Sequence, residues 1–307
     1  MPVGAYAVAS DTGRRRRRNE DNYVVAPPLF GVADGMGGAQ AGEIASHLAA
    51  TSVQHAERGG SSDEEHVTRL IQDANRSVYE RARADASTSG MGTTMTVALL
   101  DGDIVRIGHV GDSRAYLVRE GRLEQLTEDH SLVNELLKSG KLSPQEAELH
   151  PQRSVITRAV GTDPDVDVDA FAVDTSVGDI FLLCSDGLTD MVGDEDILEL
   201  VERNRRDLDA AAKALVGAAN KGGGDDNITV VAFEIAPDGE AAPAAEEPRP
   251  EDEDTLTEAD RVPTVSLTPE EEPESATGPK PPRKVLAFLV LLILAIAASI
   301  VLYVLVR

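Results

Sequence analysis

The sequence predicts an α+β fold in which two packed, mainly antiparallel sheets have helices outside them, followed by a C-terminal transmembrane helix. Three observations support this prediction. Strands within residues 93–119 are apolar on both faces, which is typical of a sheet covered on both sides. Two long stretches with helical periodicity, residues 39–57 and 64–86, can cover such sheets. Residues 285–306 form an almost continuous apolar run that is long enough to cross a bilayer.

The elements can be assigned in chain order from their periodicity and turn residues. Loose alternation over residues 3–10 predicts an edge strand, and residues 23–25 and 29–33 predict two paired strands around Pro27-Pro28. The dipeptide Asp101-Gly102 is typical of a hairpin turn. After the two helices, the expected strands are 93–100, 104–110, 114–119, 166–173, 180–184 and 228–235, and the expected later helices are 195–204 and 208–219.

A polar helical insertion at residues 129–149 separates two β segments and is a candidate lid or substrate loop. The globular domain is expected to span residues 1–236. An acidic, Pro-rich linker at 237–279, too polar to bury itself, should be disordered. A basic juxtamembrane segment at 280–284 precedes the transmembrane helix at 285–306, and its cations place the domain in the cytoplasm, with a single pass through the cell membrane.

The composition limits the possible functions. The chain has 307 residues, of which 41% are hydrophobic, so it can bury a sizeable core. The formal net charge of −25 argues against nucleic-acid binding, which needs cations to displace counterions, and is compatible with divalent cations. The single cysteine, Cys184, lies in an apolar run and excludes an internal disulfide framework.

Four acids share one local setting, because each lies at the end of an expected strand beside glycine or another turn residue. They are Asp34, Asp112, Asp186 and Asp226. Acids at strand ends of one sheet system can face one rim, where their charges repel unless cations lie among them. Oxygen ligands alone select Mg²⁺ or Mn²⁺ rather than zinc. Two such ions can activate a water molecule for attack on phosphorus, and an arginine from the run 14–18 could hold the phosphate.

Eight motifs in order give the chain a resemblance to the metal-dependent protein phosphatases of type 2C, and in particular to the bacterial membrane-anchored serine/threonine phosphatases. The resemblance covers about residues 3–235. The motifs are Gly13-x-x-Arg16-x-x-Asn19-Glu20-Asp21, Asp34-Gly35-Met36-Gly37-Gly38, Gly90-Met91-Gly92-Thr93-Thr94, Gly108-His109-Val110-Gly111-Asp112-Ser113-Arg114-Ala115-Tyr116, Asp129-His130-Ser131, Ile156-Thr157-Arg158-Ala159-Val160-Gly161, Ser185-Asp186-Gly187-Leu188 and Asp226-Asn227-Ile228-Thr229.

The resemblance implies a set of metal ligands and a cofactor of two Mn²⁺ or Mg²⁺ ions, with a third ion in bacterial relatives. Asp34 would bridge the two metals, and the carbonyl of Gly35 would hold the second. Asp186 and Asp226 would complete the first metal's ligands. Asp112, together with Asp186, would hold the third ion.

The resemblance also implies the surroundings of these ligands. Glu20 would reach the second metal through water, Asp21 would support the ligands, and Arg16 would bind the phosphate. The fold would be a four-layer sandwich, and residues 137–152 would form a mobile flap. Met36 stands where the animal enzymes carry a histidine proposed as general acid, so the residue that protonates the leaving group stays open.

The implied function is a protein-serine/threonine phosphatase that hydrolyses phosphoserine and phosphothreonine in one step and reverses membrane serine/threonine kinases. Its partners would be phosphorylated proteins, those kinases among them, and the membrane through its C-terminal helix. The alternative is an inactive membrane-anchored scaffold that binds phosphoproteins without hydrolysing them. A metal nuclease would also use clustered acids, but the acidic composition opposes it.

Overall fold

The structure is a computed structural model that describes residues 1–37, 41–56, 64–148 and 150–239. These residues belong to one compact unit, Met1–Glu246. The predicted transmembrane helix 285–306, the basic segment 280–284 and most of the predicted linker lie outside the described residues. Within the described part of the chain, no helix is both long and apolar enough to cross a membrane.

Two antiparallel sheets form the centre of the domain, as the sequence predicts. The first sheet has the order β1 (Val3–Asp11), β11 (Ile228–Ile235), β10 (Ile180–Cys184), β7 (Arg114–Arg119) and β8 (Arg122–Gln125). The second has the order β2 (Asp21–Ala26), β3 (Leu29–Met36), β5 (Met95–Asp101), β6 (Ile104–Val110) and β9 (Asp169–Asp174), with β4 (Gly92–Thr93) paired to β3.

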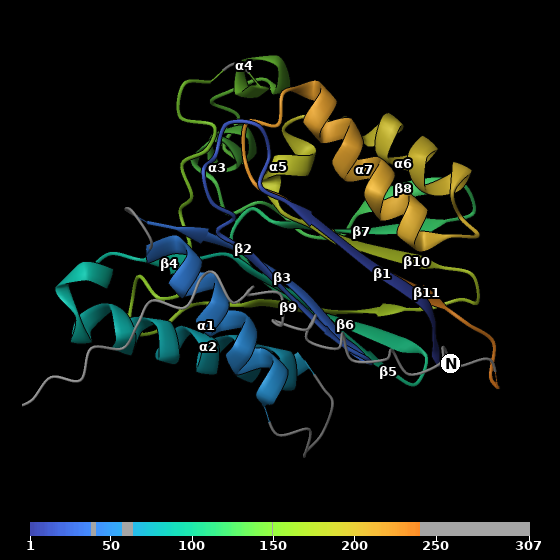
Figure 1. Ribbon diagram of the computed structural model, residues 1–307, viewed down its shortest axis with the longest axis horizontal. Coiled ribbons are helices and arrows are strands. Elements are labelled where there is room, and N and C mark those ends of the chain that lie inside the picture. The colour runs from blue at the N-terminus through green and yellow to red at the C-terminus, as the bar shows by residue number, and fades with distance from the viewer. Residues whose placement is uncertain (38–40, 57–63, 149, 240–307) are drawn as a thin grey trace, which may run out of the picture. The chain divides into compact units, whose positions relative to one another are not determined.

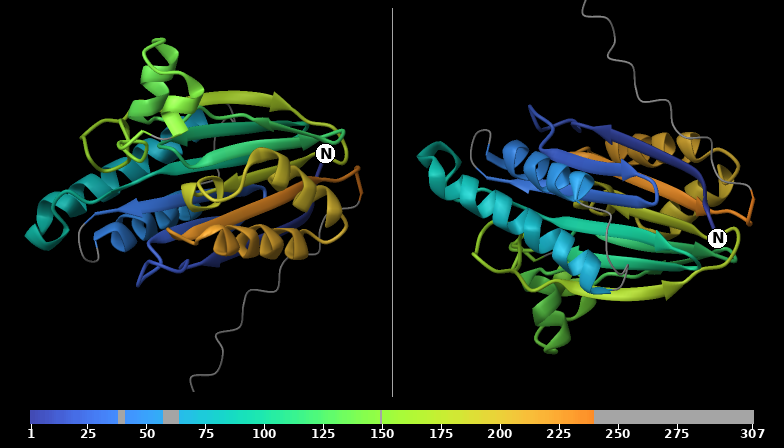
Figure 2. Two further views of the ribbon diagram at one scale, coloured as in Figure 1. Left: turned by 90° about the horizontal axis from the view of Figure 1, so that it is seen from above. Right: turned by 90° about the horizontal axis from the view of Figure 1, so that it is seen from below.

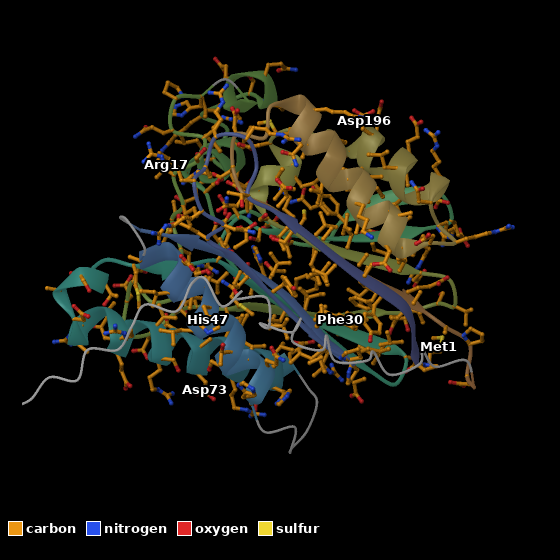
Figure 3. The ribbon with its side chains drawn as sticks, in the orientation of Figure 1. Met1, Arg17, Phe30, His47, Asp73 and Asp196 are labelled. Atoms are coloured by element: carbon orange, nitrogen blue, oxygen red, sulfur yellow. The ribbon has the colours of Figure 1, made fainter. Side chains whose placement is uncertain are left out.

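Helices cover the outer faces of both sheets. Figures 1 and 2 show α1 (Ala41–His55) and α2 (Glu64–Ala84) against the second sheet, and α6 (Asp194–Arg203) and α7 (Leu208–Gly222) against the first. Three buried apolar clusters fill the spaces between these four layers. The middle cluster contains Phe30, labelled in Figure 3, which stacks on Phe233 with ring centroids 4.3 Å apart. The expected four-layer architecture is therefore confirmed.

Short helices occupy the connections at one end of the sheets. The predicted insertion 129–149 contains α3 (Leu132–Lys138) and α4 (Pro144–Glu148), separated around Gly140. The insertion is closed at its base, because the Leu132 N–H donates to the Val155 carbonyl at 2.9 Å. The remaining short helices are η1 (Ala86–Thr88) and α5 (Asp186–Thr189).

The structure corrects several predicted boundaries. β3 continues beyond Asp34 to Met36, and the expected strand 93–100 is divided at Thr94, which bonds to Asp34 instead of continuing one ladder. β9 begins at Asp169 rather than residue 166, because its partner β6 ends just beyond His109. The sequence analysis missed β8 and α5, each only four residues long. The strands β6 and β7, joined through Gly111-Asp112, belong to different sheets, and the sequence analysis did not assign them so.

Candidate active site

The four predicted acids lie at one end of the two sheets. Asp34 is near the end of β3, and Asp112 follows β6, which runs parallel to β3 through their shared neighbour β5. Asp186 follows β10 as the first residue of α5, and Asp226 precedes β11, the antiparallel partner of β10. Positions that are more than 190 residues apart in sequence are thereby brought to one rim.

The backbone around Asp34 is held by neighbouring threonines and glycines. The Asp34 N–H donates to Thr94 Oγ1 at 2.8 Å, and the Thr94 N–H donates back to the Asp34 carbonyl at 2.9 Å. A Cβ on Gly35 would lie 2.1 Å from the Gly42 carbonyl oxygen, so only glycine fits there. This close approach lets the start of α1 pack against the end of β3, beside the carbonyl that the resemblance assigns to a metal.

Asp21 lies opposite Asp34 in the β2–β3 ladder and is only 7% exposed. Its Oδ2 accepts a 2.8 Å hydrogen bond from the Ser185 hydroxyl, which in turn accepts from the Thr229 N–H at 2.9 Å. Its Oδ1 is buried without a partner. Burial raises the pKa of Asp21 to about 6, so this carboxylate is costly to keep ionised.

Asp34, Asp112 and Asp186 carry the same electrostatic strain. Burial raises the pKa values of Asp34 and Asp186 well above the ordinary value, and the surrounding aspartates raise them further. Burial, with the nearby charge of Asp129, raises the pKa of Asp112 to about 7. Oδ1 of Asp186 is buried and has no hydrogen-bond partner. Such clustered carboxylates repel one another, and a bound cation would relieve the repulsion.

Arg16 lies against the Asp226 side of this cluster. Its Nη2 is 2.6 Å from Oδ2 of Asp226. Burial by itself would lower the pKa of Arg16, but Asp226, Glu20 and Asp34 together outweigh it and raise the pKa. Burial raises the pKa of the nearby Glu20, which Arg16 partly offsets. The predicted phosphate ligand and one predicted metal ligand are thus paired with each other, a contact that spacing along the chain could not reveal.

The donor set fits a hard divalent cation in chemistry. All the gathered side-chain ligands are oxygens, and one buried oxygen of Asp186 has no partner among the residues that the structure describes. No three His, Cys, Asp or Glu side chains among the described residues are close enough together to hold one ion. The structure thus brings the predicted acids to one rim but not into one closed set of ligands, and Asp226 is turned toward Arg16.

The turn that carries Asp112 is clamped by His130, a residue of the motif Asp129-His130-Ser131. Nδ1 of His130 accepts from the Gly111 N–H at 3.0 Å, and the His130 N–H donates to the Gly111 carbonyl at 2.8 Å. Its Nε2 lies 3.1 Å from Asp169. Gly111 has φ +114° and no room for a Cβ beside Thr94. His130 thus fixes the turn while belonging to the base of the insertion.

A cavity of about 930 Å³ lies between the insertion and α5, and its lining includes Asp112 and Asp186. Arg153, beyond α4, forms a 3.2 Å ion pair with Asp190 at the end of α5 across this region. Arg114 on β7 makes a bidentate pair with Asp129 at 2.9 and 2.7 Å. The sequence analysis gave Arg114, Arg153 and Asp190 no role in the site, although Arg114 lies within a quoted motif.

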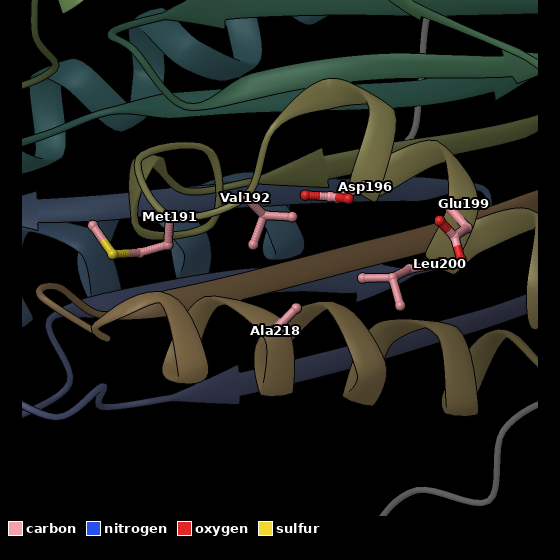
Figure 4. A pocket seen from close by; sticks show the side chains of 6 residues that line it. All are labelled: Met191, Val192, Asp196, Glu199, Leu200 and Ala218. Atoms are coloured by element: carbon pink, nitrogen blue, oxygen red, sulfur yellow. The ribbon is translucent and has the colours of Figure 1, made fainter.

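A smaller hollow of about 260 Å³ lies beside α6 and α7 (Figure 4). Asp196, Glu199 and Leu200 come from α6, and Ala218 comes from α7. None of the predicted site residues lines it. The larger cavity is therefore the one that adjoins the carboxylate rim.

Comparison with known proteins identifies the family. The family model described as Protein phosphatase 2C matches residues 18–218. The serine/threonine phosphatase stp of Listeria monocytogenes is 40% identical over 236 residues, covering 73% of this chain and 93% of that protein.

Two solved structures share the fold. The crystal structure of the Mycobacterium tuberculosis serine/threonine phosphatase PstP/Ppp has a TM-score of 0.72 and 38% identity, covering 76% of this chain and 100% of that one. A PstP catalytic domain in complex with two manganese ions has a TM-score of 0.71 and 35% identity, covering 76% and 99%. The chain therefore belongs to the protein phosphatase 2C family and is a metal-dependent serine/threonine protein phosphatase.

Proposed function

We propose that the carboxylate rim binds two Mn²⁺ ions and hydrolyses phosphoserine and phosphothreonine. Asp34 would bridge the two ions, the Gly35 carbonyl would hold one of them, and Asp186 and Asp226 would hold the other. The observation that carries this assignment is the unpartnered buried oxygen of Asp186, a group whose pKa is raised by burial and by the neighbouring acids. The all-oxygen donor set would accept Mg²⁺ as well.

When bound, the two ions supply Lewis acidity and an activated water molecule for attack on phosphorus. The chain's own residues bind and orient the phosphoester. Arg16 has a planar guanidinium suited to two phosphate oxygens, and its partner Asp226 holds it at the rim. Glu20 and Asp21 would orient the ligands and the water around them, with Asp21 held in turn by Ser185.

A third ion is proposed between Asp112 and Asp186. Burial raises the pKa of Asp186 most, and the charge of Asp112 raises it more than that of any other neighbouring acid. The His130 clamp on Gly111 keeps the Asp112 turn in place. The adjoining 930 Å³ cavity leaves room for a phosphoprotein segment beside that ion.

We also propose that the domain is held at the cell membrane, on the cytoplasmic side. There it would reverse phosphorylation by membrane serine/threonine kinases, acting on those kinases and on other phosphoproteins. The apolar run 285–306 and the preceding cations at 280–284 support this arrangement. The linker 237–279 carries 14 acids and 2 bases, so self-repulsion would keep it extended.

Hydrolysis is tested with the purified full chain and a phosphothreonine peptide, with Mn²⁺ or with a chelator. Release of phosphate is expected only with the metal, and Asp34→Asn should abolish it. Asp73→Asn, which changes an exposed acid on α2, is the matched control and should keep full activity. Phosphopeptide binding without any phosphate release would instead support the inactive scaffold.

A further inference from the structure

The connection between β1 and β2 carries five consecutive arginines, Arg14–Arg18, all of them exposed. We call residues 12–20 the arginine loop. The chain as a whole has a formal net charge of −25, so a concentration of cations at this place is a local reversal of sign. The proposed function uses only Arg16 and leaves the other four arginines unexplained.

The backbone of the arginine loop is anchored on both sides of the cationic run. The Asn227 side chain donates to the Thr12 and Arg18 carbonyls, both at 2.9 Å, and accepts from the Glu20 N–H at 2.7 Å. The Arg14 N–H donates to the Gly224 carbonyl at 2.7 Å. The side chains therefore project from a fixed base, which lowers the entropy lost when they bind an anion.

Three of the five guanidinium groups are engaged by acids of the domain. Arg15 pairs with Asp225 at 2.8 Å, Arg16 with Asp226 at 2.6 Å and Arg18 with Glu43 at 3.7 Å. Arg14 and Arg17 differ from these three. Within the described residues, neither of their side chains has an ion pair or hydrogen bond.

Arg17, labelled in Figure 3, is the residue after Arg16, and its side chain is exposed. The Cα atoms of Arg16 and Arg17 are about 3.8 Å apart, so Arg17 can reach an anion close to the phosphate that Arg16 binds. On an extended substrate peptide, a group roughly 10 Å from that phosphate is about three residues away. An exposed guanidinium without a countercharge attracts such an anion and accepts either a phosphate or a carboxylate.

We propose that Arg17, assisted by Arg14, is an anion subsite beside the phosphate-binding Arg16. The favoured substrates are phosphoproteins that carry a second phosphorylated or acidic residue within about three residues of the phosphoresidue that is hydrolysed. This inference rests on the proposed role of the rim in phosphoester hydrolysis. In this proposal the arginine loop determines the selectivity among phosphorylated sites, and the metal ligands take part in hydrolysis.

The test compares phosphothreonine peptides that differ at one position, three residues before or after the target. That position carries alanine, glutamate, lysine or a non-hydrolysable phosphonate, and kcat/KM is measured for the full chain with Mn²⁺. The wild-type protein should favour the phosphonate peptide over the alanine peptide about fivefold, in line with one exposed charge pair. The preference should fall as salt is added, because exposed charges are screened.

The double variant Arg14→Ala, Arg17→Ala should lose this preference and hydrolyse the alanine peptide at the wild-type rate. Arg122→Ala is the matched control and should keep the preference. Arg122 is an exposed arginine of β8 and pairs with Arg119, at the end of β7 that is far from Asp112. Equal rates of wild type on the alanine and phosphonate peptides, or a preference that survives in the double variant, would overturn the subsite. Absence of hydrolysis of every peptide would instead overturn the proposed function.

Discussion

Two aspartates at opposite ends of the same strand show how differently this fold treats a buried acid. Asp179 precedes β10 and is 2% exposed, yet both of its oxygens are used. Arg119 donates to them at 2.8 and 2.6 Å, and the Ser176 N–H donates at 2.7 Å. Asp186 follows β10 and has one buried oxygen without a partner among the described residues; burial and the neighbouring acids both raise its pKa.

This difference separates a structural acid from a functional one. A carboxylate that serves packing alone is expected to be paired, because an unpaired buried charge costs several kcal/mol. The arrangement around Asp186 carries that cost, which a bound cation can offset. The same substitution at the two ends of β10 should therefore have opposite consequences.

The largest effect is expected for Asp186→Asn. Removing a proposed metal ligand should lower phosphatase activity by at least about 1,000-fold. Loss of a residue that only supports a ligand typically costs less, about 10–100-fold. The measurement is kcat/KM on a phosphothreonine peptide over a range of Mn²⁺ concentrations. Activity restored by excess Mn²⁺ would show that Asp186 contributes affinity alone, and wild-type activity at all concentrations would contradict its proposed role.

The same variant should be more stable than wild type in a chelator at pH 7.5. The raised pKa of Asp186 means that its charged form opposes folding, and this destabilisation appears as the pH rises through the folded-state pKa. Asparagine removes the charge and nearly keeps the shape. Urea unfolding in the chelator at pH 7.5 measures the gain, and an equal or lower stability would argue against the repulsion described here.

Asp179→Asn should give the reverse pattern, with stability lost and activity kept. The substitution leaves Arg119 without its charged partner and should cost about 3 kcal/mol, the lower end of the range for a broken buried pair, because Arg119 is partly exposed. Chemical unfolding measures the loss, and peptide hydrolysis below the transition should match wild type. A fall in kcat/KM as large as that of Asp186→Asn would abolish the distinction between the two ends.

The sequence predicts β10 to the residue because a continuous apolar run, 180–184, stands between polar turn residues. The same logic places Asp186 after the strand. It does not reveal α5, since Asp186–Thr189 is too short to show helical periodicity. The sheet to which a strand belongs is also hidden, because the change from β6 to β7 depends on packing between layers and leaves no local pattern.

The candidate site follows the same division. The sequence shows which acids belong together, because each lies at a strand end beside a turn residue, which is a local feature, and because their motifs occur in a recognisable order. The pairing of Arg16 with Asp226 joins residues 210 positions apart, and the burial of Asp21 beside Ser185 joins residues 164 apart. Such contacts depend on the whole fold, so no local pattern could predict them. The roles assigned to the individual ligands stay predictions that the substitutions above test.

The smallest effect concerns His109, a third kind of buried titratable residue, satisfied while neutral. Its Nδ1 lies 2.9 Å from Thr96 Oγ1 and its Nε2 lies 3.1 Å from the Glu128 carbonyl. Burial lowers its pKa to about 4. Because the unfolded chain then binds a proton more readily, His109 should cost stability as the pH falls below its ordinary pKa near 6.5, the opposite trend to Asp186.

His109→Gln should remove this acid sensitivity. Between pH 7.5 and 5.5, wild type should lose about 1 kcal/mol of unfolding free energy relative to the variant. His47→Gln, at an exposed position of α1, is the matched control and should follow wild type. Urea unfolding of all three proteins in a chelator isolates the histidine, because the carboxylates are common to them. Parallel curves for wild type and His109→Gln would mean that His109 accepts its proton within the fold, and would contradict the lowered pKa.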